Sequence, residues 1–211
     1  MLENIEINCH SSIKIRCEKK DRPLFNIYID PFKIEKEQHD ADIILITHYH
    51  YDHYSPEDIE KIITDKTIIV APKTVKALSK MKNVVFVEPN NTYEVEGIKI
   101  ETIPSYNTNK QFHPKENEWV GYIIEINDIR YYVAGDTDIT NENKQVKCDV
   151  AFVPVGGTYT MTYQEAAELT NIIKPKIAIP THYGSIVGEK DDGERFKNLL
   201  NSDIECEIML K

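Results

Sequence analysis

The sequence predicts an α/β fold, and three observations support this. Apolar, β-branched runs of strand length recur along the chain, helix-start signals stand between several of them, and no linker or low-complexity tract divides the 211 residues. Strands that alternate with helices are typical of α/β proteins. We therefore expect a single domain, residues 1–211, with two sheet-rich halves.

The first predicted elements are strands. Residues 4–9 and 12–18 alternate apolar and polar side chains, which indicates strands with one buried face. Residues 24–30 are nearly all apolar and end at Asp30-Pro31, which is a turn signal. Residues 42–47 form an apolar, β-branched run, which predicts a buried strand.

Helices and strands alternate in the middle of the chain. Ser55 precedes Pro56 and two acidic residues, which predicts an N-cap and a helix over residues 56–63. The further expected elements are a strand at 67–71, an amphipathic helix at 72–81, a strand at 84–87 and a strand at 93–103 with a turn at 96–97.

The last third repeats this order. Residues 119–126 and 129–134 predict a hairpin about Asn127-Asp128. Thr162 and Glu165 have the spacing of a capping box, so a helix is expected from there to Ile173. The other expected elements are strands at 149–155, 176–180 and 205–210 and a helix at 193–200.

The loop after residue 47 carries the strongest chemical signal. It places His48, His50, Asp52 and His53 between a predicted strand and a predicted helix. Residues two apart in an extended segment point the same way, so His48 and His50 can converge on one ion while the other two face a second. Imidazoles with a carboxylate suit zinc, and also iron or manganese. The alternative, a solvated loop, is disfavoured by the strand–loop–helix context.

The spacing H-x-H-x-D-H at residues 48–53 is similar to the signature of the metallo-β-lactamase superfamily. Asp30, Asp136 after Gly135, and His182 resemble its other anchors. The chain looks most like a small branch of metal-dependent hydrolases near the ascorbate-lactonase-like proteins. This resemblance implies a four-layer αββα sandwich, with two facing sheets and helices outside.

The resemblance also implies a dinuclear centre with two divalent metal ions, zinc being favoured over Mn²⁺ or Fe²⁺. A metal-activated hydroxide would then cleave an ester, lactone or phosphoester bond in a small molecule. One ion would be held by His48, His50 and His113. The other would be held by Asp52, His53 and His182, with Asp136 as the bridging ligand.

His113 is the least regular member of this set. Much of the superfamily has a histidine where this chain has Tyr106 or Asn107. We expect the loop to bring His113 back as the replacement, stiffened by the proline that follows it. The alternative is a solvated loop histidine. Lys110 and Lys115 flank His113; attraction of an anionic substrate is one interpretation of them, and plain solvated loop lysines are the alternative.

Catalysis also needs a proton donor for the leaving group. Tyr106, Tyr183 and His10 are candidates, and Asp52 is expected to act in catalysis as well as in metal binding. His10 lies between the first two predicted strands, where a plain turn residue is the alternative. His39, in a charged segment, is expected at the surface.

The composition of the chain limits which partners and which cellular compartment we expect. The net charge of −10 disfavours binding to nucleic acid. Neither a signal peptide nor a membrane-spanning stretch is evident, so we expect a cytoplasmic protein. No cysteine forms a C-x-x-C pair, and reduced thiols are expected at Cys9, Cys17, Cys148 and Cys206. The oligomeric state stays open.

Two other function classes fit part of the pattern. One is a mononuclear iron dioxygenase that uses the same ligands. The other is a non-catalytic metal-binding protein with a degenerate site, which the missing histidine near Tyr106 favours. Metal content separates the three classes, since two zinc or manganese ions, one iron, or no metal would each indicate a different one.

Overall fold

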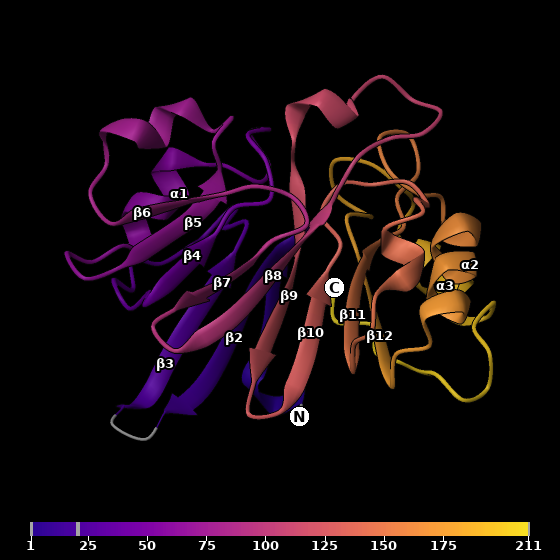
Figure 1. Cartoon of the computed structure of the whole chain (residues 1–211). Helices are drawn as coiled ribbons and strands as arrows, with labels where there is room; N and C mark the ends of the chain where they lie inside the picture. Colours follow the sequence, from indigo (N-terminus) through magenta and orange to yellow (C-terminus); the bar gives the residue numbers. More distant parts are fainter. Residues whose placement is uncertain (1, 20–21, 211) are drawn as a thin grey trace. The chain divides into compact units, whose positions relative to one another are not determined.

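A computed structural model describes residues 2–19 and 22–210 of the chain. The chain groups into two compact units, residues 1–87 and 88–211, each built on a sheet with both parallel and antiparallel strand pairs (Figure 1). The prediction of a single domain over residues 1–211 stays a prediction.

The first unit contains a sheet with the order β1-β2-β3-β4-β5-β6. Its first three strands pair antiparallel, and the strands from β3 onward pair parallel. The strands are β1 (Ile5–Cys9), β2 (Ser12–Lys19), β3 (Arg22–Ile29), β4 (Ile43–Leu45), β5 (Ile68–Pro72) and β6 (Val84–Val87). The helices are α1 (Pro56–Ile62) and the 3₁₀ turns η1 (Leu2–Asn4) and η2 (Lys76–Lys80).

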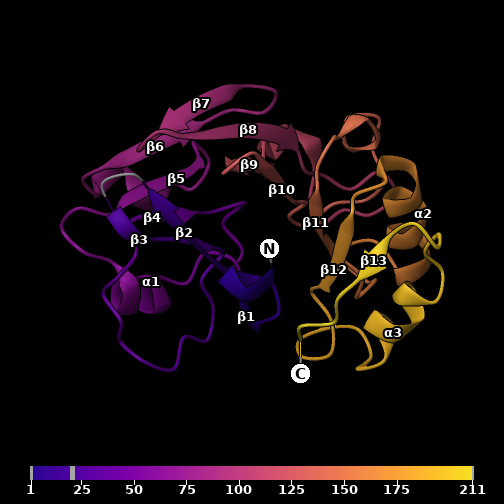
Figure 2. The same cartoon turned by 90° about the horizontal axis from the view of Figure 1, so that it is seen from below.

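The second unit contains a sheet with the order β13-β12-β11-β10-β9-β8-β7. Its strands are β7 (Thr92–Val95), β8 (Ile98–Pro104), β9 (Val120–Ile126), β10 (Ile129–Val133), β11 (Val150–Pro154), β12 (Ile177–Thr181) and β13 (Glu205–Cys206). Its helices are α2 (Tyr163–Ile173), α3 (Asp192–Lys197) and the 3₁₀ turns η3 (Lys115–Asn117) and η4 (Asn143–Gln145). α2 and α3 lie side by side next to β11 and β12 (Figure 2).

Strand direction in the second unit gathers several loops at one edge. β10, β11 and β12 are parallel, and β8 runs the same way because β9 is antiparallel to both β8 and β10. The carboxyl ends of these strands therefore meet at one edge of the sheet. The segments that follow them begin at Ser105, Ala134, Val155 and His182.

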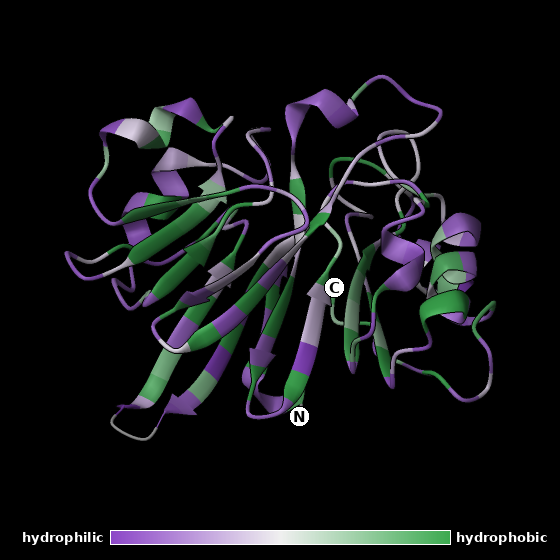
Figure 3. Ribbon diagram, viewed as in Figure 1, coloured by the Kyte–Doolittle hydropathy of each residue, from purple (hydrophilic) through white to green (hydrophobic). Residues whose placement is uncertain are grey.

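Each unit has its own apolar core. In the first unit, Ile59 and Ile62 of α1 pack against Ile44 of β4 and Ile69 of β5. In the second unit, Ala167 and Leu169 of α2 belong to the cluster that includes Ala151 and Val153 of β11. β4 and β5 are hydrophobic along most of their length (Figure 3), as expected for strands buried on both faces.

Most predicted elements are confirmed to within a few residues at their ends. The capping box at Thr162 and Glu165 is present, and the hairpin turns at Asn127-Asp128. The predicted helix at 72–81 is wrong: only the 3₁₀ turn at Lys76–Lys80 forms, and Met81 is exposed. The strand predicted at 205–210 shortens to Glu205–Cys206, and α3 ends at Lys197 instead of residue 200.

Among residues 2–19 and 22–210, no helix has the length and apolar character needed to cross a bilayer.

Candidate metal centre

The ligand loop of the first unit leaves β4 and enters α1. Ser55 caps α1, because its side chain accepts a hydrogen bond from the Asp58 backbone, and Pro56 opens the helix as predicted. The backbone amides of His53 and Tyr54 both donate to the carbonyl of His50, which closes the loop into a tight turn. The histidine side chains therefore project from a short segment held at both ends.

Asp30 and Thr47 orient two of these imidazoles. Asp30 is fully buried, and its carboxylate accepts hydrogen bonds from the Thr47 amide at 2.8 Å, from Thr47 Oγ1 at 2.6 Å and from His53 Nδ1 at 2.7 Å. Burial raises the pKa of the Asp30 carboxyl, and the contacts with His53 and Thr47 oppose that rise. Because Nδ1 of His53 is the donor, its Nε2 carries the lone pair that a metal needs.

The same reasoning determines the tautomer of His48. Thr47 Oγ1 gives its only proton to Asp30, so it accepts from His48 Nδ1 at 2.9 Å. His48 Nε2 is thereby left as a lone-pair donor, and it lies 3.1 Å from Nδ1 of His50. Two ring nitrogens from residues two apart thus approach one point, as the sequence predicts.

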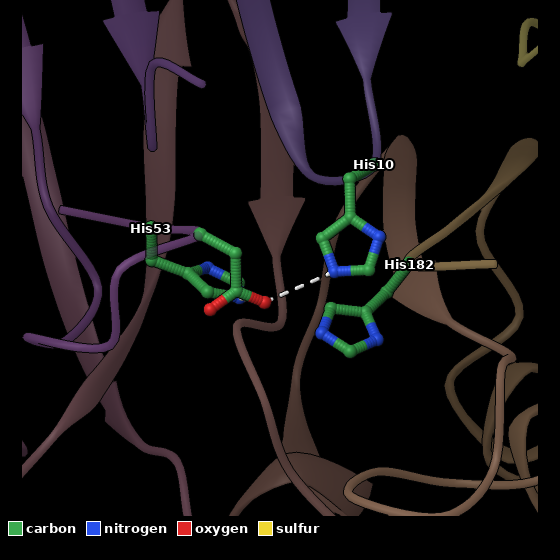
Figure 4. A group of neighbouring side chains, drawn as sticks. His10, His53 and His182 are labelled. Atoms are coloured by element: carbon green, nitrogen blue, oxygen red, sulfur yellow. Dashed lines mark hydrogen bonds and ion pairs between the residues drawn. The ribbon is translucent and has the colours of Figure 1, made fainter. Parts of the chain in front are cut away.

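His10 and Asp52 form a buried pair in the same unit. His10 Nε2 lies 3.2 Å from Asp52 Oδ2, the contact drawn as a dashed line in Figure 4, and His53 Nε2 is 3.6 Å from the same oxygen. His10 occupies the β1–β2 turn with φ +55°, a conformation that glycine or asparagine adopts more easily. The turn placement is as expected, and the side chain is buried.

The second unit brings His113, Asp136 and His182 together. His113 Nε2 lies 3.2 Å and His182 Nε2 lies 3.1 Å from the same oxygen, Oδ2 of Asp136, and all three residues are buried. Asp136 follows β10 after Gly135, whose φ of +65° permits the turn, and His182 directly follows β12. The alternative of a solvated loop histidine at 113 is therefore excluded, because the side chain is buried.

Asn107 explains how His113 reaches this position. The side-chain Oδ1 of Asn107 accepts a hydrogen bond from the backbone amide of His113 at 3.0 Å and lies 3.1 Å from His113 Nδ1. The backbone amide of Asn107 donates to the His113 carbonyl at 2.8 Å. The loop from 107 to 113 is thus closed on itself, and Nδ1 of His113 becomes the donor. Sequence reasoning treated Asn107 only as a departure from a histidine and did not assign it this role.

Other predicted site residues lie elsewhere in the second unit. Tyr106 Oη donates to Glu142 at 2.9 Å, and its ring lies under the Lys115 ammonium. The Tyr183 side chain is packed in the α2–α3 core, where a Cβ on Gly193 would lie 2.4 Å from its hydroxyl, and burial raises its pKa to about 12. His39, in the first unit, is exposed as expected.

The two lysines beside His113 are occupied by carboxylates. Lys110 Nζ contacts Asp138 Oδ1 at 2.5 Å, and Lys115 Nζ contacts Glu142 Oε1 at 2.8 Å. Asp138 also accepts from the Thr108 amide at 2.8 Å, so it fixes the loop that carries His113. Both ammonium groups are therefore paired with carboxylates of the protein, and the attraction of an anionic substrate by these lysines stays a prediction.

Within each unit, pairs of donor atoms have the separation that binding to a common metal ion requires. Metal–nitrogen and metal–oxygen bonds near 2.1 Å place neighbouring ligand atoms about 3.0–3.4 Å apart. His48 Nε2 and His50 Nδ1 in the first unit have this separation, as do Asp136 Oδ2 and each of its two imidazole neighbours in the second. Buried imidazoles held by further hydrogen bonds to carboxylate, hydroxyl or amide oxygens are typical of metal ligands.

Comparison with known proteins agrees with this chemistry. A family model described as a beta-lactamase superfamily domain matches residues 9–182. A UPF0173 metal-dependent hydrolase from Methanopyrus kandleri is 31% identical over 205 residues, covering 87% of this chain and 89% of the relative.

Solved structures give the same result. One from Parabacteroides distasonis, described as a metal-dependent hydrolase, has a TM-score of 0.81 and 33% identity, covering 98% of this chain and 93% of that one. One from Thermotoga maritima, described as a zinc-dependent hydrolase of the metallo-β-lactamase superfamily, has a TM-score of 0.64 and 21% identity over 97% and 96% of the two chains. This second likeness bears on the fold alone.

The predicted α/β class and metallo-β-lactamase fold are therefore confirmed. The family match spans most of the chain, including both groups of candidate ligands, and the relative from Methanopyrus kandleri aligns over nearly its whole length. The chain belongs to the β-lactamase superfamily and, within it, to the UPF0173 family.

Proposed function

We propose that this protein is a metal-dependent hydrolase that cleaves an ester, lactone or phosphoester bond in a small molecule with two divalent metal ions, zinc being the first choice. One observation carries the proposal: each unit holds donor atoms at metal-ligand spacing, all on buried residues except the half-buried His50, and several of the ring nitrogens are oriented by other side chains. The printed names of the relatives, metal-dependent hydrolase, support the reaction class.

The proposed ligands come from both halves of the chain, as the superfamily pattern implies. The first half supplies His48, His50, Asp52 and His53, and the second half supplies His113, Asp136 and His182. The closed Asn107–His113 loop supports His113 as the replacement for the missing histidine. The same observation weighs against a degenerate, non-catalytic site.

A bound divalent metal ion lowers the pKa of water and polarises the bond that is cleaved. The protein's own groups do the remaining work. Asp30, Thr47 and Asn107 keep the imidazoles in the tautomers that leave a lone pair available. His10 Nε2 lies 3.2 Å from Asp52 Oδ2, and His10 in its imidazolium form would deliver a proton to a leaving group and be left as neutral imidazole.

His10 is preferred over the two tyrosines as the proton donor. The Tyr106 hydroxyl is engaged by Glu142 and Lys115, and the Tyr183 hydroxyl faces α3 within the core. His10 instead contacts a proposed metal ligand directly.

We also propose a cytoplasmic location and no nucleic-acid partner. Cys17, Cys148 and Cys206 are free thiols, which fits a reducing compartment. The net charge of −10 opposes a phosphate backbone.

The decisive test is elemental analysis of untagged protein, with hydrolysis assays on a simple lactone, p-nitrophenyl acetate and bis-p-nitrophenyl phosphate. About two zinc or manganese ions per chain, with turnover, are expected. About one iron with oxygen uptake would favour the dioxygenase, and metal without turnover would favour a binding role. His182→Ala should lose metal and activity, whereas His39→Asn, at an exposed histidine, should lose neither. A fully active, fully metallated His182→Ala protein would contradict the assignment.

A further inference from the structure

Two aromatic side chains stand exposed beside the ligand group of the second unit. Phe112 directly precedes His113 and is 48% exposed, and Tyr159, in the loop after β11, is 37% exposed. Their rings meet edge to face, with centroids 4.7 Å apart. Exposed apolar residues are common singly, but an exposed aromatic pair next to a proposed metal ligand is a candidate recognition surface.

The two backbone segments that carry these rings are held by hydrogen bonds. Asn107, which closes the His113 loop, also donates from Nδ2 to the Tyr159 carbonyl at 2.9 Å. The Tyr159 loop is closed by hydrogen bonds from the Gly157 amide to the Met161 carbonyl at 3.0 Å and from the Thr160 amide to the Gly157 carbonyl at 2.8 Å. The Asn107 side chain therefore links the backbone of His113, which directly follows Phe112, to the backbone of Tyr159.

The charges around the pair indicate what kind of group it binds. Lys110 is paired with Asp138 and Lys115 with Glu142, so these two ammonium groups are already neutralised by the protein. The recognition surface that remains is the two ring faces. Rigid aromatic rings lose little conformational entropy on binding and favour apolar or aromatic partners.

We propose that Phe112 and Tyr159 bind an apolar, preferably aromatic, substituent of the substrate while its reacting group is held at the metals. This inference rests on the proposed function and adds to it a substrate class: a hydrolysable ester, lactone or phosphoester with an aryl or bulky alkyl group. Phe112 and Tyr159 thus determine specificity.

The test compares two anions that differ only in the apolar group, methylphosphonate and phenylphosphonate, by calorimetric titration of the metal-loaded full chain. Phenylphosphonate should bind about tenfold more tightly to the unaltered protein, because the ring adds aromatic contact area. In Phe112→Ala and Tyr159→Ala the preference should fall to about twofold or less. Tyr159→Phe, which keeps the ring, and Leu199→Ala, which removes a 47% exposed apolar side chain of the same unit, should retain it.

Two results would overturn the inference while metal content is normal. One is equal affinity of the unaltered protein for both phosphonates, or no binding of either. The other is an unchanged preference in both alanine variants. Phe112→Leu is the control for a folding defect, because it keeps an apolar side chain. It should give an intermediate preference for phenylphosphonate over methylphosphonate. A protein that takes up no metal at all would instead overturn the proposed function, and this inference with it.

Discussion

The carboxylate of Asp30 lies 2.7 Å from Nδ1 of His53, and both side chains are buried. The two residues are far apart in the sequence. Asp30 directly follows β3, and His53 lies in the loop that leaves the neighbouring parallel strand β4. The hydrogen bond fixes which nitrogen of His53 faces away from Asp30, so in the proposed centre Asp30 would act on a metal through His53.

Replacing Asp30 with asparagine should therefore weaken metal binding without removing a ligand. An amide keeps the size and one acceptor but lowers the basicity of His53, and loss of such a partner costs about 10–100-fold in metal affinity. Competition with a chromogenic zinc chelator measures this. His39→Asn is the control, and an Asp30→Asn protein with unaltered zinc affinity would contradict the proposed role.

Asn107 allows a sharper separation of two functions. Asn107→Asp keeps an acceptor for His113 but loses the amide donor to Tyr159, whereas Asn107→Ala loses both contacts. We expect Asn107→Ala to lower metal occupancy and Asn107→Asp to retain it with a weaker preference for aryl substituents. Elemental analysis and the phosphonate titrations distinguish the two. Equal metal content in both variants would show that Asn107 does not position His113.

Local signals predicted the fold well, and the main failure comes from a local pattern that fits two kinds of helix. The capping box at Thr162 needs only a few neighbouring residues, so the sequence contains the whole motif. The prediction of an α-helix over residues 72–81 failed because Val75 and Leu78, three residues apart, lie on the same face of a 3₁₀ turn as well as of an α-helix. Periodicity over one turn cannot separate these two helix types.

Most candidate ligands could be proposed from the sequence because they cluster in one motif or follow strands, whereas His113 lies in a loop. Their supporting residues could not be. Thr47 and Asn107 act through hydrogen bonds to histidine rings whose direction depends on how the loops close. The pairing of Lys110 with Asp138, 28 residues away along the chain, likewise depends on tertiary structure. Sequence spacing alone therefore could not predict the ion pair of Lys110.

Gly156 should be essential for the position of His182. A Cβ added there would lie 2.1 Å from the His182 carbonyl oxygen and 2.7 Å from Val187, closer than real atoms approach. Gly156→Ala is expected to displace His182, with a loss of about 1–3 kcal/mol in unfolding free energy and a large loss of activity. Urea unfolding and the hydrolysis assay measure both effects.

Gly97→Ala is the matched control for that substitution. Gly97 has φ +70° with open space around it, so alanine there costs only backbone strain, about 1 kcal/mol, and leaves activity unchanged. If Gly156→Ala behaved like Gly97→Ala, the close approach to His182 would have no functional importance.

Glu101 should make stability depend on pH in the acidic range. Arg130 binds its carboxylate through two nitrogens at 2.9 and 3.1 Å, and with Lys99 it lowers the pKa of Glu101 from 4.5 to about 2. The folded state thus favours the ionised form, so the stabilisation is complete above pH 4.5 and is lost as the pH falls from 4.5 towards 2. Because the pair is partly exposed, we expect Glu101→Gln to lower the free energy of unfolding by only about 1 kcal/mol at pH 7.

Urea unfolding from pH 7 downward should show the stabilities of Glu101→Gln and the unaltered protein converging. Glu168→Gln, at an exposed position on α2, should follow the unaltered protein throughout. A constant difference between Glu101→Gln and the unaltered protein at every pH would mean that packing, not charge, accounts for the loss.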